Sequence, residues 1–266
     1  MHLTRILPIV GLFAVAACQT APAPPSGFLA SYDALEAPGF SLRASVAQRR
    51  DESALDRLER VHLQPAVLTE GAGEALDQGE RDAVLREVDR RLCFALSRRF
   101  TLVPEPSEDA GVVRTAVTRI RPTGRVASAV SAVAGHFASV PLLDIRIPGT
   151  TGGLAVESEL LGPDGAQLAA VTWNRNATVI GREGSSLSRI GDAVQLTGAA
   201  GGTVERAFST EARERRPVDD PDPCAAYGPR RNPPRWVASK LFGFATGLYQ
   251  PEVEGLARPA DAEPTP

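Results

Sequence analysis

Lysine and histidine are nearly absent from this sequence. Lys240 is the only lysine among the 29 basic residues of a 266-residue chain, and the chain has three histidines. We interpret the arginine bias as the coding preference of a GC-rich genome, because nothing local requires arginine at every basic position. The formal net charge of −3 is too small to predict binding to nucleic acid or to an acidic substrate.

The motifs of common catalytic and metal sites are missing as well. There is no Gly-x-Ser-x-Gly elbow, and no glycine-rich loop ends in Lys-Ser or Lys-Thr. His62 and His136 have no cysteine, histidine or carboxylate at metal-ligand spacing, so we expect each to be structural or exposed. Three aspartates lack the glycine and the distal glutamate of a calcium loop: Asp219, Asp220 and Asp222. We therefore predict no catalytic residue, no metal and no cofactor.

Glu157 and Glu159 come closest to a catalytic pair. They are two residues apart in a predicted strand and therefore share one face of the sheet. A paired-carboxylate site is one interpretation, and a solvated sheet face is the one that we favour. A periplasmic hydrolase is accordingly the third of our functional hypotheses.

The apolar run near the N-terminus is too short for a membrane-spanning anchor. Ile6–Ala17 has about half of the roughly 20 residues that span a bilayer, which favours a cleaved signal peptide over residues 1–17. The stretch Val15-Ala16-Ala17-Cys18 resembles the lipobox of bacterial lipoproteins. This resemblance implies diacylglycerol on the Cys18 thiol and N-acylation, for example with palmitate, after cleavage; an ordinary cleavage site is the alternative. Gln19, in place of aspartate, favours the outer membrane by analogy with enterobacterial sorting.

The rest of the chain divides by composition. Residues 18–27 are proline-rich and are expected to form a tether that holds the domain off the membrane, and residues 28–218 form the main domain. A charged, proline-broken stretch, Asp219–Pro223, begins a C-terminal appendage at residues 219–252. Residues 253–266 lack apolar periodicity and are expected to be disordered.

Hydrophobic periodicity predicts a helix and a hairpin most clearly. The helix is Glu80–Phe100, in which four apolar residues share one face: Leu85, Val88, Leu92 and Leu96. Phe94 lies among arginines on another side of this helix. The hairpin comprises Gly153–Leu161 and Ala166–Thr178, because the Gly162-Pro163-Asp164-Gly165 stretch between them suits a tight turn.

Further elements complete the predicted fold. They are strands at Val61–Leu68 and Val112–Ile120, and a helix at Leu187–Arg213 that is weakened by Gly198 and the Gly201-Gly202 pair. This order of elements predicts an α+β fold, with helices packed on one face of a mostly antiparallel sheet and a C-terminal helical appendage.

Two stretches resemble a known protein family. The stretch Ser26–Leu35 is similar to the opening motif of bacterial lipoproteins known as domain of unknown function 3313, in which Gly-Phe-Leu-x-x-Tyr follows the tether; here these residues are Gly27-Phe28-Leu29-Ala30-Ser31-Tyr32. The hairpin stretches 156–161 and 168–171 resemble the second signature of that family, and Gly191-Asp192 with Ala207-Phe208 fit its closing helix more loosely. The resemblance covers residues 26–213. It implies an envelope lipoprotein without established catalytic residues.

Cys93 and Cys224 are the thiols that are left once Cys18 is acylated. An even number of thiols in an oxidising periplasm predicts a disulfide. Cys93 lies on the flank of its helix, away from the leucine stripe, where it can meet the appendage. Two unpaired buried cysteines are the alternative.

Small residues recur at a spacing of four in two further segments. They are Ala127, Ser131, Gly135 and Ser139 in one segment, and Ser239, Gly243 and Gly247 in the appendage. In a helix this spacing lets another backbone approach closely. We expect the appendage to form a helix over residues 235–249, whose apolar arc packs on the main domain beside Phe94: Val237, Leu241, Phe244 and Leu248. Self-association of this helix is one alternative. Contact with the membrane is the other, in which three arginines before the apolar arc meet the phospholipid headgroups: Arg230, Arg231 and Arg235.

These observations lead to one principal functional hypothesis. The chain is expected to be a non-enzymatic lipoprotein, anchored through Cys18 in the outer membrane and facing the periplasm, that binds or scaffolds an unidentified envelope protein. The second hypothesis is a homo-oligomer whose small-residue helices build an assembly or a pore-associated ring.

Overall fold

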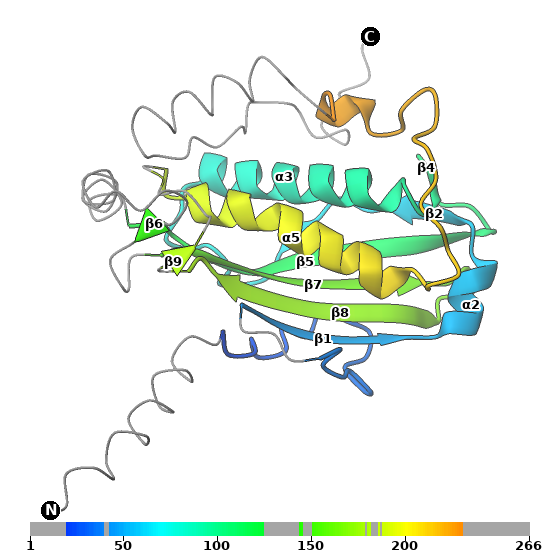
Figure 1. Ribbon diagram of the computed structural model, residues 1–266, viewed down its shortest axis with the longest axis horizontal. Helices are drawn as coiled ribbons and strands as arrows, with labels where there is room; N and C mark the ends of the chain where they lie inside the picture. The colour runs from blue at the N-terminus through cyan, green and yellow to red at the C-terminus, as the bar shows by residue number, and fades with distance from the viewer. Residues whose placement is uncertain are drawn as a thin grey trace, which may run out of the picture.

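A seven-stranded sheet with two long helices on one side forms the centre of the molecule (Figure 1). The computed structural model describes residues 20–39, 43–124, 144–145, 151–178, 180–181, 186 and 188–230. The strand order is β1-β8-β7-β5-β2-β4, and β3 also pairs with β5. This arrangement of helices and sheet confirms the predicted α+β class.

The sheet is antiparallel in one half and parallel in the other. The antiparallel neighbours are β1 (Ala44–Arg50), β8 (Gln167–Asn176), β7 (Gly153–Leu161) and β5 (Ala110–Arg121). Three short strands pair in parallel: β2 (Arg60–Leu63), β3 (Val67–Leu68) and β4 (Thr101–Val103). β6 (Asp144–Ile145) and β9 (Ile180–Gly181) form a separate antiparallel pair.

The predicted strand Val61–Leu68 is divided into β2 and β3. Pro65 has no N–H group for the strand ladder. The N–H of the next residue, Ala66, donates instead to the Asp89 carboxylate at 2.7 Å. The chain therefore leaves the sheet between Leu63 and Val67, and Ala66 is hydrogen-bonded to the long helix that contains Asp89.

The helices differ from their predicted ranges mainly at their ends. α3 (Gln78–Leu96) begins with a capping box, in which Asp77 accepts from the Glu80 N–H and Glu80 accepts from the Asp77 N–H. Its predicted apolar stripe is buried in the core. α5 (Gly191–Phe208) lies inside the predicted helix Leu187–Arg213, and α2 (Glu52–Arg57) and the 3₁₀ turn η1 (Ala225–Tyr227) are short.

β7 has two different faces. Leu154, Val156 and Leu160 belong to the core between the sheet and the helices. Glu157 and Glu159 alternate with them and therefore point to the opposite face. We call this second side the open face of the sheet, and Figure 1 shows the N-terminal segment lying on it.

Candidate functional site

The N-terminal segment holds Glu157 on the open face; we call residues 20–32 the strap. Ser26 donates to the Glu157 carboxylate from its backbone N–H at 3.0 Å and from its hydroxyl at 2.6 Å. The Tyr32 hydroxyl donates to the same carboxylate at 2.6 Å and accepts from the Gly27 N–H at 2.9 Å. Glu157 is only 3% exposed. Donors from the strap therefore stabilise a carboxylate that burial alone would destabilise.

Glu159 is fully buried and is held by three segments of the chain. The Ala30 N–H and the Gln167 amide each donate to its Oε2 at 2.8 Å, and Arg114 Nη1 lies 3.1 Å from its Oε1. The Phe28 ring packs over the Arg114 guanidinium, 5.0 Å from ring centre to Cζ. Our expectation of a solvated sheet face is therefore wrong, because the strap covers both carboxylates.

The Gly-Phe-Leu-x-x-Tyr stretch has a structural role in this contact. Gly27 has a φ of +84°, a conformation that favours glycine. Leu29 is buried. Phe28 and Tyr32 reach Arg114 and Glu157, as described above. Glu157 and Glu159 thus bind the strap of their own chain rather than forming an open acid–base pair.

The strap contacts the sheet from its first described residue. The Thr20 hydroxyl donates to the Arg43 carbonyl at 3.1 Å, and the Asn174 amide donates to the Ala21 carbonyl at 2.7 Å. Arg119 in turn donates to the Asn174 side-chain oxygen at 2.5 Å. Much of the segment that we expected to be a free tether therefore lies on the sheet.

A hollow of about 640 Å³ lies between α5 and the edge strand β1. We call it the α5–β1 groove. α5 packs mainly on β7 and β8, which leaves part of β1 uncovered. Trp173, Val46 and Ala199 are the larger apolar residues along the groove, and Trp173 is only 2% exposed because it belongs to the core.

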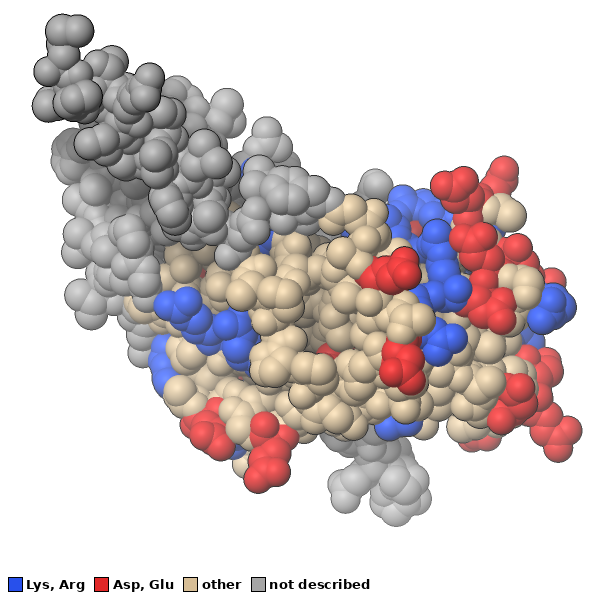
Figure 2. Space-filling view, turned by 90° about the horizontal axis from the view of Figure 1, so that it is seen from below, with Lys and Arg blue, Asp and Glu red and all other residues tan. Residues whose placement is uncertain are grey.

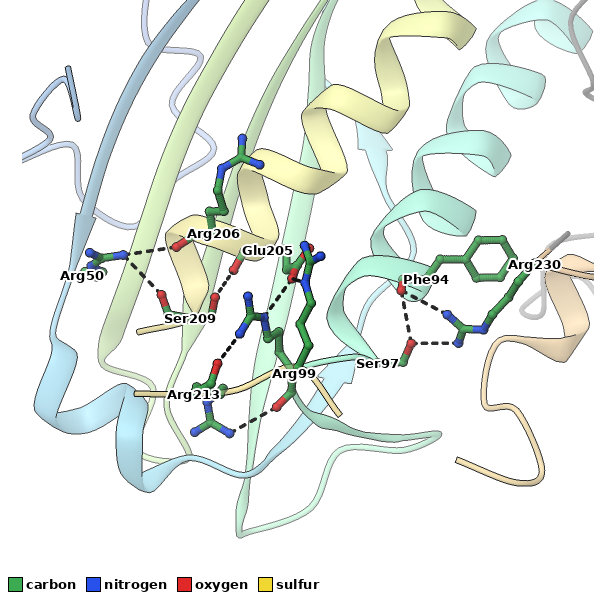
Figure 3. A network of polar contacts seen from close by, with 10 residues as sticks. Arg50, Phe94, Ser97, Arg99, Glu205, Arg206, Ser209, Arg213 and Arg230 are labelled. Carbon is green, nitrogen blue, oxygen red and sulfur yellow. Dashed lines mark hydrogen bonds and ion pairs between the residues drawn. The ribbon is translucent and has the colours of Figure 1, made fainter. Parts of the chain in front are cut away.

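Arginines lie at both ends of the α5–β1 groove. Arg43 and Arg175 lie where β1 begins, and Arg50 and Arg206 lie where β1 and α5 end. Arg50 donates to the carbonyls of Arg206 and Ser209, both at 3.2 Å, as Figure 3 shows. None of the residues that line the groove is acidic. The charged side chains that line the groove are therefore all positive.

The glycines of α5 have two different roles. Gly198 and Gly202, one helical turn apart, line the groove, and a Cβ atom on Gly198 would meet no atom within 4 Å. Gly201 faces α3 instead, where a Cβ atom would lie 3.2 Å from the Arg91 carbonyl oxygen. The sequence indicated only that these glycines weaken the helix. In the structure, Gly201 permits the close packing of α5 on α3, whereas Gly198 and Gly202 leave the groove open.

The appendage is joined to α3 by a disulfide. Cys93 and Cys224 are bonded, with 5.9 Å between their Cα atoms, and both are buried. These are the two cysteines that we expected to pair. Cys224 is therefore fixed to the side of α3 that carries Cys93.

Phe94 lies between two arginines beside this disulfide. The guanidinium carbons of Arg90 and Arg230 are 5.0 and 4.8 Å from its ring centre. Arg230 also donates to the Phe94 carbonyl at 3.1 Å and to the Ser97 hydroxyl at 2.8 Å (Figure 3). Arg230 of the appendage therefore covers Phe94. The helix that we predicted over residues 235–249 lies outside the described residues.

Glu205 fastens the end of α5 to the segment that follows it. Arg99 Nε and Arg215 Nε lie 2.8 and 2.9 Å from Glu205 Oε1 (Figure 3 labels Arg99 and Glu205). Burial raises the pKa of Glu205, but hydrogen bonds from Arg215 and Arg99 outweigh it and hold the pKa below its usual value. Arg213 packs over Phe100, 4.6 Å from its ring centre.

Three further candidate polar residues, His62, Asp219 and Asp222, have structural partners. His62 Nδ1 lies 3.2 Å from the Val103 carbonyl oxygen. Asp219 pairs with Arg216 at 2.5 Å, and Asp222 pairs with Arg230 at 2.6 Å. Within the described ranges, no group of three or more histidine, cysteine, aspartate or glutamate residues is arranged to hold a metal ion. The helices in that part of the chain include none that is long and apolar enough to cross a membrane.

Several predicted sites lie outside the described residues. They are the lipidation site Cys18, His136, the small residues at 127–139, and the helix-packing face Ser239, Gly243 and Gly247. Lipid anchoring and self-association through these residues stay predictions.

Comparisons with known proteins identify the family of the chain. A PelC dodecamer from Paraburkholderia phytofirmans has a TM-score of 0.37 and 13% identity, covering 65% of this chain and 99% of that chain. A dodecamer of a PelC variant from the same organism has a TM-score of 0.36 and 12% identity, covering 63% and 98%. These similarities are too low to support a functional argument. No curated protein matches. Residues 24–203 match the family model described as a protein of unknown function (DUF3313), so the chain belongs to that family.

Proposed function

We propose that the chain is a lipoprotein of the bacterial cell envelope that binds or scaffolds other envelope components without catalysis. In this proposal Cys18 bears the lipid in the outer membrane, and the folded domain faces the periplasm. The engagement of Glu157 and Glu159 by the strap supports a non-catalytic role, because their oxygens accept hydrogen bonds from the protein itself.

The position of the strap carries this proposal. Thr20 is hydrogen-bonded on the sheet and is the second residue after Cys18. One residue spans at most about 3.6 Å, so the lipid-bearing residue lies within about 7 Å of Thr20. A lipid at Cys18 would therefore hold the domain directly against the bilayer surface, in one orientation.

The distribution of charge supports the same orientation. Figure 2 shows that most of the visible acidic side chains gather at the right-hand end. This end carries α2 in Figure 1, and the strap begins toward the other end. Anionic lipid headgroups repel carboxylates, so the α2 end should point away from the membrane. The Cys93–Cys224 disulfide is typical of an oxidising compartment such as the periplasm.

Replacement of Cys18 tests the anchoring directly. In the native host, the wild-type chain should incorporate radiolabelled palmitate and fractionate at outer-membrane density. Cys18→Ala should incorporate no label and accumulate as a slower-migrating precursor. Glu214→Gln is the control, since Glu214 is exposed and its replacement leaves both the lipidation site and the disulfide intact. A Cys18→Ala chain that is still processed and still fractionates with membranes would refute the proposal.

A further inference from the structure

We propose that the end of the sheet where the strap begins binds the anionic headgroups of a bilayer surface, with Arg119 and Arg43 as the phosphate contacts. This inference rests on the lipid-anchored role proposed above, because it names the lipid chemistry that the anchored domain meets. We call this region the basic end of the sheet. It comprises residues 43–47, 117–124, 151–156 and 172–178, where β1 and β7 begin and β5 and β8 end.

The two ends of the sheet differ in charge. The basic end contains four arginines and no aspartate or glutamate, and the strap contains no charged residue. The opposite end, formed by residues 50–60, 105–110 and 161–167, contains eight acidic residues and three arginines. β8 alone separates the two ends by about 30 Å, several times the Debye length of about 8 Å at physiological salt. A surface that meets the basic end is therefore screened from the acidic one.

Arg119 carries a charge that no carboxylate in the described ranges neutralises. It pairs with Ala155 in the sheet and so lies on the open face. Its Nη2 donates to the side-chain oxygens of Asn174 at 2.5 Å and of Asn176 at 2.9 Å. Both acceptors are neutral amides, so they orient the guanidinium and leave its charge in place. Burial, and then repulsion from nearby Arg121, lower the pKa of Arg119, as is typical of a cation without a carboxylate beside it.

Arg43 is the second phosphate contact. It is exposed at the start of β1. Arg121 and Arg175 also lie at the basic end, but each has an interaction of its own, so neither is needed for the binding. The planar guanidinium of arginine fits the oxygens of a phosphate group. Arg43 and Arg119 together therefore offer two such groups to an anionic surface.

The two arginines flank the start of the strap. The Arg43 carbonyl accepts from the Thr20 hydroxyl, and Asn174, which holds Arg119, donates to the Ala21 carbonyl at 2.7 Å. Thr20 is the second residue after Cys18, so the lipid-bearing residue lies within about 7 Å of it. The headgroups that surround the lipid on Cys18 therefore lie next to both arginines. This position favours a bilayer surface over an acidic segment of another protein.

Binding to vesicles tests the proposal without the lipid anchor. The mature chain with Cys18→Ser is sedimented with vesicles of phosphatidylcholine alone, or of equal parts phosphatidylcholine and phosphatidylglycerol. Partitioning into the anionic vesicles should be stronger by about tenfold or more, because each arginine near an anionic surface contributes about fivefold. The gain should vanish in about 1 M salt, where the Debye length is about 3 Å. The full chain has a formal net charge of −3, so non-specific attraction to these vesicles is not expected.

Charge variants locate the contact. Arg119→Gln and Arg43→Gln should each reduce partitioning into anionic vesicles about fivefold, whereas Arg119→Lys, which keeps the charge, should stay within about twofold of the wild type. Arg57→Gln is the matched control, because it removes an exposed arginine from α2 at the opposite end and should leave partitioning unchanged. Urea unfolding of each variant checks that the fold is retained.

Phenylglyoxal, which modifies arginine side chains, gives a readout at each position. Mass spectrometry of the wild-type mature chain with Cys18→Ser should show slower modification of Arg119 and Arg43 when anionic vesicles are present. Modification of Arg57 should not change. Glycerol phosphate at the same phosphate concentration should protect neither arginine, because it does not present an array of charges.

Four results would overturn the proposal. They are equal partitioning into both kinds of vesicle, wild-type partitioning of Arg119→Gln and Arg43→Gln, protection by glycerol phosphate as strong as that by vesicles, and a loss of partitioning in Arg119→Lys as large as in Arg119→Gln. The last result would assign Arg119 to positioning Asn174 and the strap. Because the tested chain carries no lipid, none of these results depends on the anchoring of Cys18, which is judged by its own experiment.

Discussion

The Tyr32 hydroxyl donates a 2.6 Å hydrogen bond to Glu157, a residue 125 positions further along the chain. Tyr32 ends the Gly-Phe-Leu-x-x-Tyr motif of the first stretch that resembles the family, and Glu157 lies in the second stretch. The Ala30 N–H donates to Glu159 and makes a second hydrogen bond between the same two stretches. The two stretches that resemble the family are therefore the two sides of one contact, in which the strap covers β7.

Removing the Tyr32 hydroxyl should measure the strength of this contact. Tyr32→Phe leaves the buried Glu157 carboxylate without one donor and the Gly27 N–H without its acceptor. We expect a loss of about 1–3 kcal/mol in the free energy of unfolding, measured with urea. In a double-mutant cycle with Glu157→Gln, the two losses should be non-additive by about 1 kcal/mol or more. Additive losses would show that the two side chains do not interact.

Removing the disulfide should destabilise the chain through its unfolded state. The bond joins residues with a sequence separation of 131. For a loop of this length, the chain-entropy model gives a contribution of about 4–5 kcal/mol. The double variant Cys93→Ser/Cys224→Ser should lose that much in urea unfolding, relative to the oxidised wild type. Recovery of both thiols free in non-reducing peptide mapping would contradict the bond itself.

The ion pairs of Glu205 should make stability depend on pH. The folded state holds the pKa of Glu205 below its usual value, so its contribution is present at neutral pH. This contribution is lost as the pH falls below about 5 and the carboxylate is protonated. Glu205→Gln should cost about 1–3 kcal/mol at pH 7, toward the lower figure because Arg215 is half exposed and screened. The difference from wild type should close toward pH 3.

Glu214→Gln is the control for this measurement. Glu214 is exposed in the same segment, so its replacement should change stability by less than about 0.5 kcal/mol at either pH. A difference between Glu205→Gln and wild type that stays constant from pH 7 to pH 3 would show that the charge of Glu205 does not stabilise the fold.

The glycines of α5 should respond in opposite directions to alanine. Gly198→Ala adds a Cβ in open space and should stabilise the helix by about 0.5–1 kcal/mol. Gly201→Ala places a Cβ 3.2 Å from the Arg91 carbonyl oxygen, on a helix that the disulfide and the core hold in place. It should be less stable than Gly198→Ala by about 1–3 kcal/mol, measured by thermal unfolding. Equal stability of the two variants would contradict the packing of α3 on α5 at Gly201.

The sequence locates best the elements that have a repeating apolar face or a distinctive turn. The stripe of α3 recurs every three or four residues, and β7 and β8 flank a turn of glycine, proline and aspartate, so both were located closely. β1 was not predicted. All seven of its residues are only half buried, so its sequence has no contrast between a buried and an exposed side. β4 has three residues, too few for any periodicity.

The candidate sites depend on contacts between distant residues, which periodicity does not report. Glu157 and Glu159 share a strand face, as the sequence predicts, but only the folded strap reveals that this face is covered. The groove joins Arg43 and Val46 of one edge with Gly198 and Gly202 of α5, and no local motif connects these positions. In the sequence, Gly198 and the Gly201-Gly202 pair predict only a weakened helix, because glycine lowers helix stability wherever its side of the helix faces.

The orientation of the domain on the membrane tests the account most directly. Lipidated protein carrying a fluorophore at Arg43→Cys or at Asp164→Cys is reconstituted into vesicles whose lipid headgroups bear a quencher. Asp164 lies in the turn between β7 and β8, at the other end of strands that span about 25–30 Å. If the strap holds the domain against the bilayer, the label at residue 43 is strongly quenched and the label at residue 164 keeps its emission. Equal quenching at the two positions, or stronger quenching at residue 164, would contradict a domain seated on the membrane by its strap.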